Sequence, residues 1–102
     1  MQPNEVIAIM RHTGLLKTEP TSTRERVTSA VHYLMVERGV SVEELARVLG
    51  AKSTHYVQHR KLKENRWKID DFDLLGEYFD VHPGEFAFGY RALAETETET
   101  HD

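Results

Sequence analysis

The sequence contains no cysteine, which excludes disulfides and thiolate metal sites and is compatible with a reducing, cytoplasmic environment. No apolar run approaches the roughly 20 residues that a helix needs to span a bilayer. The N-terminus lacks the basic region and the apolar core of a signal peptide, so we expect no export. There is no glycine-rich phosphate loop and no nucleophile elbow, so we expect neither an enzyme nor a cofactor.

The net charge of −4 conceals a strong segregation of charge along the chain. Residues 51–68 hold six basic residues and one acid, whereas residues 69–92 hold six acids and one arginine. The last ten residues add four negative charges, and the first fifty sum to zero. Because a polyanion responds to a local basic patch more than to the overall charge, the sequence remains compatible with nucleic-acid binding.

The most informative stretch is residues 41–66, which predicts two short helices joined by a tight polar turn. Ser41 and Glu44 have the spacing of a capping box at the start of the first helix. Gly50 permits the sharp turn after it, and Ser53 is the expected N-cap of the second helix. The second helix is rich in polar and basic residues. Such a pair is a helix-turn-helix, a shape that fits the major groove of DNA.

The packing of the second helix is less regular. Tyr56 and Val57 are both expected to face the core. At 100° per residue, Leu62 lies about 140° from Val57 and so on the wrong side of an α-helix. We therefore expect the helix to fray or end within residues 60–63, with Leu62 folding back onto the core.

The rest of the chain predicts further helices and no strand. Ser22 and Glu25 form a second capping box, which starts a helix that Gly39 ends. Residues 70–79 predict a helix with acids outward, and Pro83 starts a short one. We expect the helix over residues 70–79 to turn four apolar residues toward the core: Ile69, Phe72, Leu75 and Phe79.

The two ends of the chain have distinct compositions. Residues 4–11 are apolar and fit either a helix or a strand, and they could form a dimerisation arm or a helix that caps the core. Residues 94–102 are acidic, lack apolar anchors and are expected to be disordered. We therefore divide the chain into an N-terminal arm or short helix with a linker (1–20), a helix-turn-helix domain (21–93) and a disordered acidic tail (94–102). The expected fold is all-α, a compact bundle of about five short helices.

Residues 31–86 resemble the Cro/C1-type helix-turn-helix domain of phage repressors and many bacterial regulators. The run GVSVEELARVLG matches the first half of that domain, including Ala46 and Gly50. The run WKIDDFDLLGEYFDVHPGEF resembles the helix after the recognition helix in actinobacterial and actinophage members. The chain departs from the usual pattern in four places. Glu64 stands where a glycine usually closes the recognition helix, and Lys68 replaces the usual Ser or Thr N-cap. The segment between Gly50 and Trp67 is a residue or two longer, and Gly76 replaces an alanine.

The resemblance implies a lambda-repressor-like fold and a cytoplasmic, sequence-specific transcriptional regulator of phage or prophage type, a repressor or Cro-like protein. It also implies a homodimer that binds a double-stranded DNA operator with residues 53–63 as the recognition helix. The implied base contacts are Ser53, Thr54, His55, Gln58 and His59. The implied phosphate contacts are Arg38, Ser41, Lys52, Arg60, Lys61, Lys63 and Arg66.

Two other interpretations were weighed from the residues. His55 and His59 are four residues apart on a helix, a spacing that could hold a metal, but no third ligand is evident and we expect no metal site. The chain could instead be a protein-interaction module, such as an antitoxin or an anti-repressor partner. It would then use the acidic helix, the acidic tail or the apolar cluster of Val6, Ile7, Ile9 and Met10.

Overall fold

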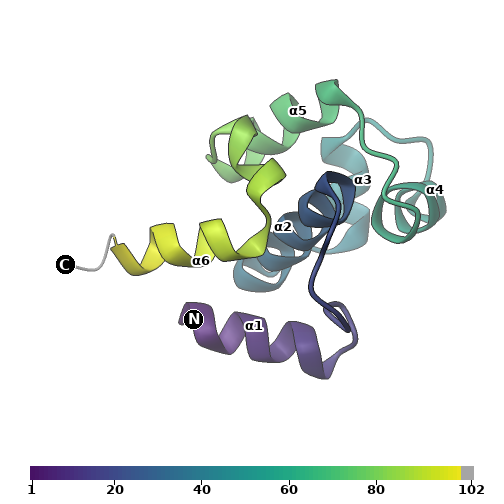
Figure 1. Ribbon diagram of the computed structural model, residues 1–102. Coiled ribbons are helices and arrows are strands. Elements are labelled where there is room, and N and C mark those ends of the chain that lie inside the picture. The colour runs from purple at the N-terminus through teal and green to yellow at the C-terminus, as the bar shows by residue number, and fades with distance from the viewer. Residues whose placement is uncertain (100–102) are drawn as a thin grey trace.

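The computed structural model describes residues 1–99, with side chains as far as Thr96, and in this part the chain forms helices and loops without a strand. None of the described helices is long and apolar enough to cross a membrane. Helix α2 runs through the middle of the fold and packs against α1, η2 and α6 (Figure 1). The helical segments are α1 (Pro3–His12), α2 (Thr23–Arg38), α3 (Val42–Val48), α4 (Thr54–Tyr56), the π-helix η1 (Val57–Lys63), α5 (Ile69–Phe79), the 3₁₀-helix η2 (Pro83–Phe88) and α6 (Tyr90–Glu99).

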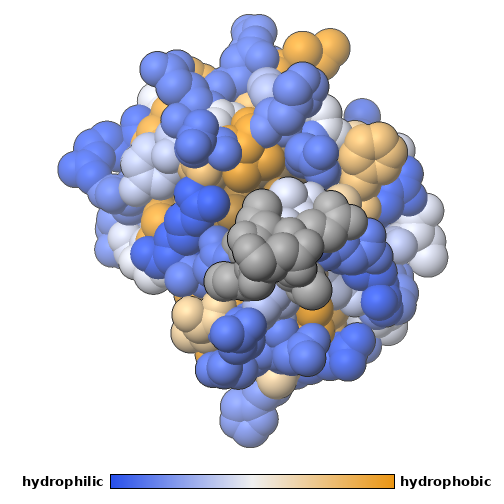
Figure 2. Space-filling model, turned by 90° about the vertical axis from the view of Figure 1, so that its left-hand side faces the viewer, coloured by the Kyte–Doolittle hydropathy of each residue, from blue (hydrophilic) through white to orange (hydrophobic). Residues whose placement is uncertain are grey.

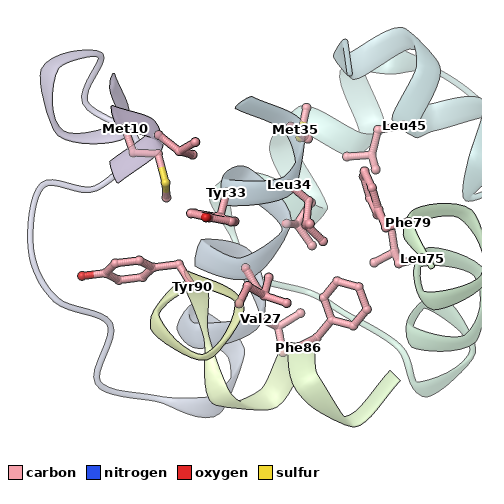
Figure 3. Close-up of a cluster of buried hydrophobic side chains, with 14 of the residues drawn as sticks. Met10, Val27, Tyr33, Leu34, Met35, Leu45, Leu75, Phe79, Phe86 and Tyr90 are labelled. Carbon is pink, nitrogen blue, oxygen red and sulfur yellow. The ribbon is translucent and has the colours of Figure 1, made fainter. Parts of the chain in front are cut away.

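Helix α2 forms where its end signals predict it. The Ser22 hydroxyl accepts the Glu25 N–H at 3.1 Å, and the Glu25 carboxylate accepts the Ser22 N–H at 3.0 Å, so the capping box is complete. Gly39 ends the helix in the left-handed conformation, with φ of 65°. Figure 3 shows the buried side chains of α2 together with those that the neighbouring helices pack against them. Those labelled are Met10, Val27, Tyr33, Leu34, Met35, Leu45, Leu75, Phe79, Phe86 and Tyr90.

Residues 4–11, whose sequence fits either a helix or a strand, lie in helix α1. The segment is a helix that begins at Pro3, with Val6 and Met10 fully buried against the core. Ile9 of the same apolar cluster is 37% exposed. The strand alternative is therefore wrong, and the segment has the packing of a helix that caps the core.

Helix α6 corrects the expectation of a disordered tail from residue 94. Tyr90 is fully buried, and its N–H donates to Ser29 Oγ at 3.1 Å while its hydroxyl donates to Glu19 at 2.6 Å. Leu93 and Ala94 are also buried, so the helix continues from this anchor to Glu99. The remaining residues of the expected tail, 100–102, lie outside the described part. The face of the molecule around the end of α6 is mostly hydrophilic, with apolar patches between the polar side chains (Figure 2).

Helix α5 is present as expected, but its buried face differs at two positions. Leu75 and Phe79 are buried and Phe72 packs on the core, whereas Ile69 is 81% exposed at the first position of the helix. Gly76 lies on the buried face, where α5 touches the loop that follows it. A Cβ at Gly76 would lie only 2.7 Å from the Val81 carbonyl oxygen.

This contact predicts that Gly76→Ala destabilises the protein. Alanine favours a helix over glycine by about 1 kcal/mol, but a clash with backbone cannot be relieved by turning a side chain. We expect the overpacking cost of about 1–3 kcal/mol to prevail, which urea denaturation would measure. Glu77→Ala, at the exposed neighbouring position, is the control and should change stability little. A Gly76→Ala protein more stable than wild type would contradict the packing described.

A second consequence concerns His32 on α2. Its Nδ1 is completely enclosed and has no hydrogen-bond partner among the described groups. Burial lowers the pKa of His32 to about 4, from an ordinary value of 6.5. Below pH 6.5 the unfolded chain therefore binds a proton that the folded protein takes up only near pH 4, and stability falls across that interval.

The loss that this one group contributes between pH 6.5 and pH 4 amounts to about 3 kcal/mol at most. His32→Leu should therefore flatten the decline in unfolding free energy between these pH values, measured by urea denaturation. His12→Leu at an exposed position should leave the decline as in wild type. Equal pH dependence in wild type and His32→Leu would show that His32 is not held neutral by burial.

Candidate nucleic-acid interface

Helix α3 begins where its sequence predicts, although its capping box is only half formed. Ser41 Oγ accepts the Glu44 N–H at 3.1 Å. The Glu44 carboxylate does not return to the cap, because it pairs with Arg47 and accepts the Tyr78 hydroxyl at 2.6 Å. The reciprocal bond expected of Glu44 is thus replaced by a tie to α5. The helix buries Leu45 and Ala46.

The turn after α3 leads directly into α4. Gly50 adopts a φ of 63°, which glycine tolerates best, and the Ala51 N–H donates to the Ala46 carbonyl at 2.9 Å. Ser53 then caps the next helix, since its Oγ accepts the Tyr56 N–H at 3.1 Å. The N-cap expected at Ser53 is therefore confirmed.

One of the two residues expected to face inward after this cap does not do so. Val57 is fully buried, whereas Tyr56 is 38% exposed. Adjacent residues of a helix point about 100° apart, so they cannot both occupy one inward position. The inward orientation expected of Tyr56 is therefore wrong.

The next seven residues form the wide helix η1, which ends at Lys63, within the range where the helix was expected to fray or end. The Glu64 N–H donates to the His59 carbonyl, five residues earlier, at 3.0 Å. Because a π-helix brings residues i and i+5 onto one side, Leu62 joins Val57 in packing on the core. Leu62 does turn back to the core, as expected, but through a wider helix that ends at Lys63.

Lys61 is the main correction to the expected phosphate contacts. Its side chain is directed inward, the residue is 3% exposed, and Nζ lies 2.5 Å from Asp71 Oδ2 on α5. The same Asp71 oxygen accepts the Lys68 N–H at 2.9 Å, which caps α5. The Lys61 ammonium also lies 5.9 Å from the centre of the Trp67 ring. Lys61 is thus enclosed and paired, and it does not reach the surface where phosphate would lie.

A second polar anchor holds the end of η1 against α2. Thr28 Oγ1 donates to Asn65 Oδ1 and accepts the Trp67 Nε1–H at 2.8 Å. Asn65 has a φ of 59°, which lets the chain leave the helix sharply, and asparagine tolerates that conformation better than most residues. The loop after η1 is therefore tied to α2 through Thr28.

The residues expected to contact bases lie together at the start of α4 and along η1. His55, Gln58 and His59 are exposed, whereas Thr54 is half-buried. Ser53 is exposed, but its hydroxyl is already engaged in the cap. The His55 and His59 rings are 4.1 Å apart between centroids. No group of three potential ligands able to hold a metal occurs in the described part of the chain.

Four of the expected phosphate contacts are exposed: Lys52, Arg60, Lys63 and Arg66. Lys52 and Arg60 line a concavity with His55 and His59, whereas Lys63 lines a different one with Gln58. Glu64 pairs with Arg60 at 3.1 Å and with Arg66 at 2.9 Å, so it neutralises part of the patch. No ion pair of Lys52 or Lys63 occurs among the described residues.

The other two expected phosphate contacts, at the entrance to α3, are already engaged within the fold. Arg38 donates to the Phe79 carbonyl and pairs with Glu37 at 3.0 Å, and Ser41 caps α3.

Sequence reasoning missed two cations that the fold adds to this region. Arg24 from the first turn of α2 and Lys68 line a concavity together with Tyr56, Arg66 and Trp67. Both cations are exposed. Arg24 is distant in sequence, so no local pattern could place it there. Lys68 belongs to the basic run of residues 51–68 and is the N-cap of α5.

No family model, no curated protein and no solved structure shows a significant match to this chain. The assignment of the region as a binding surface therefore depends on the geometry and charge described above.

The Thr28 anchor predicts a measurable loss of stability when its hydroxyl is removed. Thr28→Val keeps the shape but leaves Trp67 Nε1 and Asn65 without their partner, which should cost about 1–3 kcal/mol. Chemical denaturation would measure the loss. Thr13→Val removes a hydroxyl at the C-cap of α1, whose bond to the Ile9 carbonyl is exposed, and should cost little. Equal small effects of the two substitutions would contradict the role of Thr28.

Proposed function

We propose that this protein is a sequence-specific DNA-binding transcriptional regulator whose segment from α3 to η1 is a helix-turn-helix. One observation carries the proposal. Two consecutive helical segments joined by a tight turn expose polar side chains that are able to bond base edges, together with cations, while Val57 and Leu62 fix the opposite face in the core. A second helix of this kind fits the major groove. The resemblance to the Cro/C1-type domain supports the same interpretation.

In this proposal the exposed side of residues 53–63 faces the bases. Gln58 can bond bidentately to adenine through its amide, and His55 and His59 can donate to acceptor atoms of guanine. Thr54 contributes less, because it is half-buried. Ser53 keeps its cap while its exposed edge meets the DNA backbone.

The proposed phosphate contacts are revised from those expected. Lys61 is excluded by its burial, and Arg24 and Lys68 are added. Arg60 and Arg66 would exchange Glu64 for phosphate, since both ion pairs are exposed and exposed pairs are weak. Lys52 and Lys63 would bind phosphate without breaking a described pair.

The partner in this proposal is a double-stranded operator bound by a homodimer on two related half-sites, as helix-turn-helix regulators commonly do. The regulator would be a phage or prophage repressor or a Cro-like protein acting in the cytoplasm of the host. The alternative of a protein-interaction module was favoured by the apolar N-terminal cluster. Val6 and Met10 of that cluster are fully buried in the core, so we favour DNA binding.

Two substitutions separate base reading from phosphate binding. Gln58→Ala should weaken discrimination by about 1–3 kcal/mol at one base pair, while the salt dependence of binding stays unchanged. Lys63→Ala should weaken binding to all sequences and reduce the slope of log K against log salt by about 1. Binding to a preferred duplex and a scrambled duplex at two or more salt concentrations measures both effects.

Neither substitution disturbs a buried contact, so wild-type stability is the control for each. If both variants lost affinity equally on every sequence, the assignment of Gln58 to base reading would be wrong. If wild type showed no salt-sensitive binding to any duplex, the proposed function itself would fail.

A further inference from the structure

A buried ion pair such as that of Lys61 and Asp71 is an unusual way to stabilise a fold if stability is its only effect. Removing an ammonium and a carboxylate from water is costly, and apolar side chains of similar size often stabilise a protein as well or better. What an ion pair adds is dependence on geometry. Its gain is realised only when the two charged groups meet at short range, as they do here at 2.5 Å.

The position of the pair relates it to the candidate interface. Lys61 lies on η1 between exposed Gln58 and exposed Lys63, and its own side chain points into the protein. Asp71 Oδ2 receives both the Lys61 ammonium and the backbone N–H of Lys68. One oxygen therefore fixes the rotation of η1 relative to the first turn of α5. Val57 and Leu62 permit more freedom, because apolar contacts are not directional.

We propose that the Lys61–Asp71 pair is a positioning device that sets the orientation of residues 54–63 and so determines which side chains reach the bases. The inference rests on the proposed function for its consequence at DNA, but not for the structural effect itself. Lys61 acts through Gln58 and His59 and does not contact DNA.

The test compares three variants with wild type. Lys61→Met keeps the length of the side chain and removes the charge. The double variant Lys61→Met/Asp71→Asn also removes the unpaired carboxylate, and its amide oxygen can still accept the Lys68 N–H. Lys63→Met makes the same change at an exposed lysine two residues away and serves as the matched control. Each is examined for its denaturation midpoint, its affinity for preferred and scrambled duplexes, and the salt dependence of binding.

Lys61→Met should lower the denaturation midpoint, because Asp71 is left charged and buried, and the double variant should recover much of it. Both should lose about tenfold or more of the preference for the selected duplex, the scale of one base contact, with the wild-type salt slope. Lys63→Met should reduce that slope by about 0.9 instead. A reduced slope in Lys61→Met would overturn the proposal, since it would make Lys61 a phosphate contact. Wild-type discrimination in the double variant would also overturn it, by reducing the pair to a structural contact.

A measurement without DNA separates failure of this inference from failure of the proposed function. Residual dipolar couplings report the orientation of residues 54–63 relative to α5 in solution. They should change in the double variant and stay as in wild type for Lys63→Met. An unchanged orientation in the double variant would overturn the inference even if wild type binds DNA. A changed orientation would support it even if no duplex is bound.

Discussion

A single carboxylate, that of Asp71, connects η1, which carries much of the candidate DNA-binding surface, to the start of α5. It caps α5 through the Lys68 N–H and holds η1 through the Lys61 ammonium. Because both bonds use the same oxygen, the start of one helix and the rotation of the other are coupled. This contact, together with the packing of Val57 and Leu62 on the core, sets the direction in which the exposed side chains of His55, Gln58 and His59 point.

The charge distribution gives this surface its character. The acids of α5 follow the basic run in the sequence, and one of them, Asp71, pairs with Lys61 inside the protein. The exposed cations remain on the side of η1 and the adjoining loop, where Arg24 of α2 joins them. A negative net charge and a cationic face are thus compatible, because a polyanion approaching within a Debye length responds to the nearby cations first.

End signals and periodicity predicted the parts of the fold that short-range physics determines. The Ser22 box, the Ser53 cap and the Gly39 and Gly50 exits are local contacts, and they form as expected. The prediction of Lys61 as a phosphate contact failed because Lys61 pairs inside the protein with Asp71, a residue on another helix. Lys61 follows Val57 by four residues, a spacing that places both side chains on one face of a helix and so indicates the core for Lys61 as well. Leu62 reaches the core through a π-helix, which a period of 100° per residue does not describe. Buried Tyr90, Leu93 and Ala94 anchor the start of α6, which the acidic composition of residues 94–102 did not indicate.

The central claim is that the exposed face of residues 53–63 reads a DNA sequence. Selection of bound duplexes from a random pool, by the wild-type protein at moderate salt, tests it most directly. The account predicts enrichment of one short motif, repeated with two-fold symmetry if the protein binds as a dimer, and loss of binding as salt rises. A pool that stays random through successive rounds, or binding that is insensitive to salt, would contradict it.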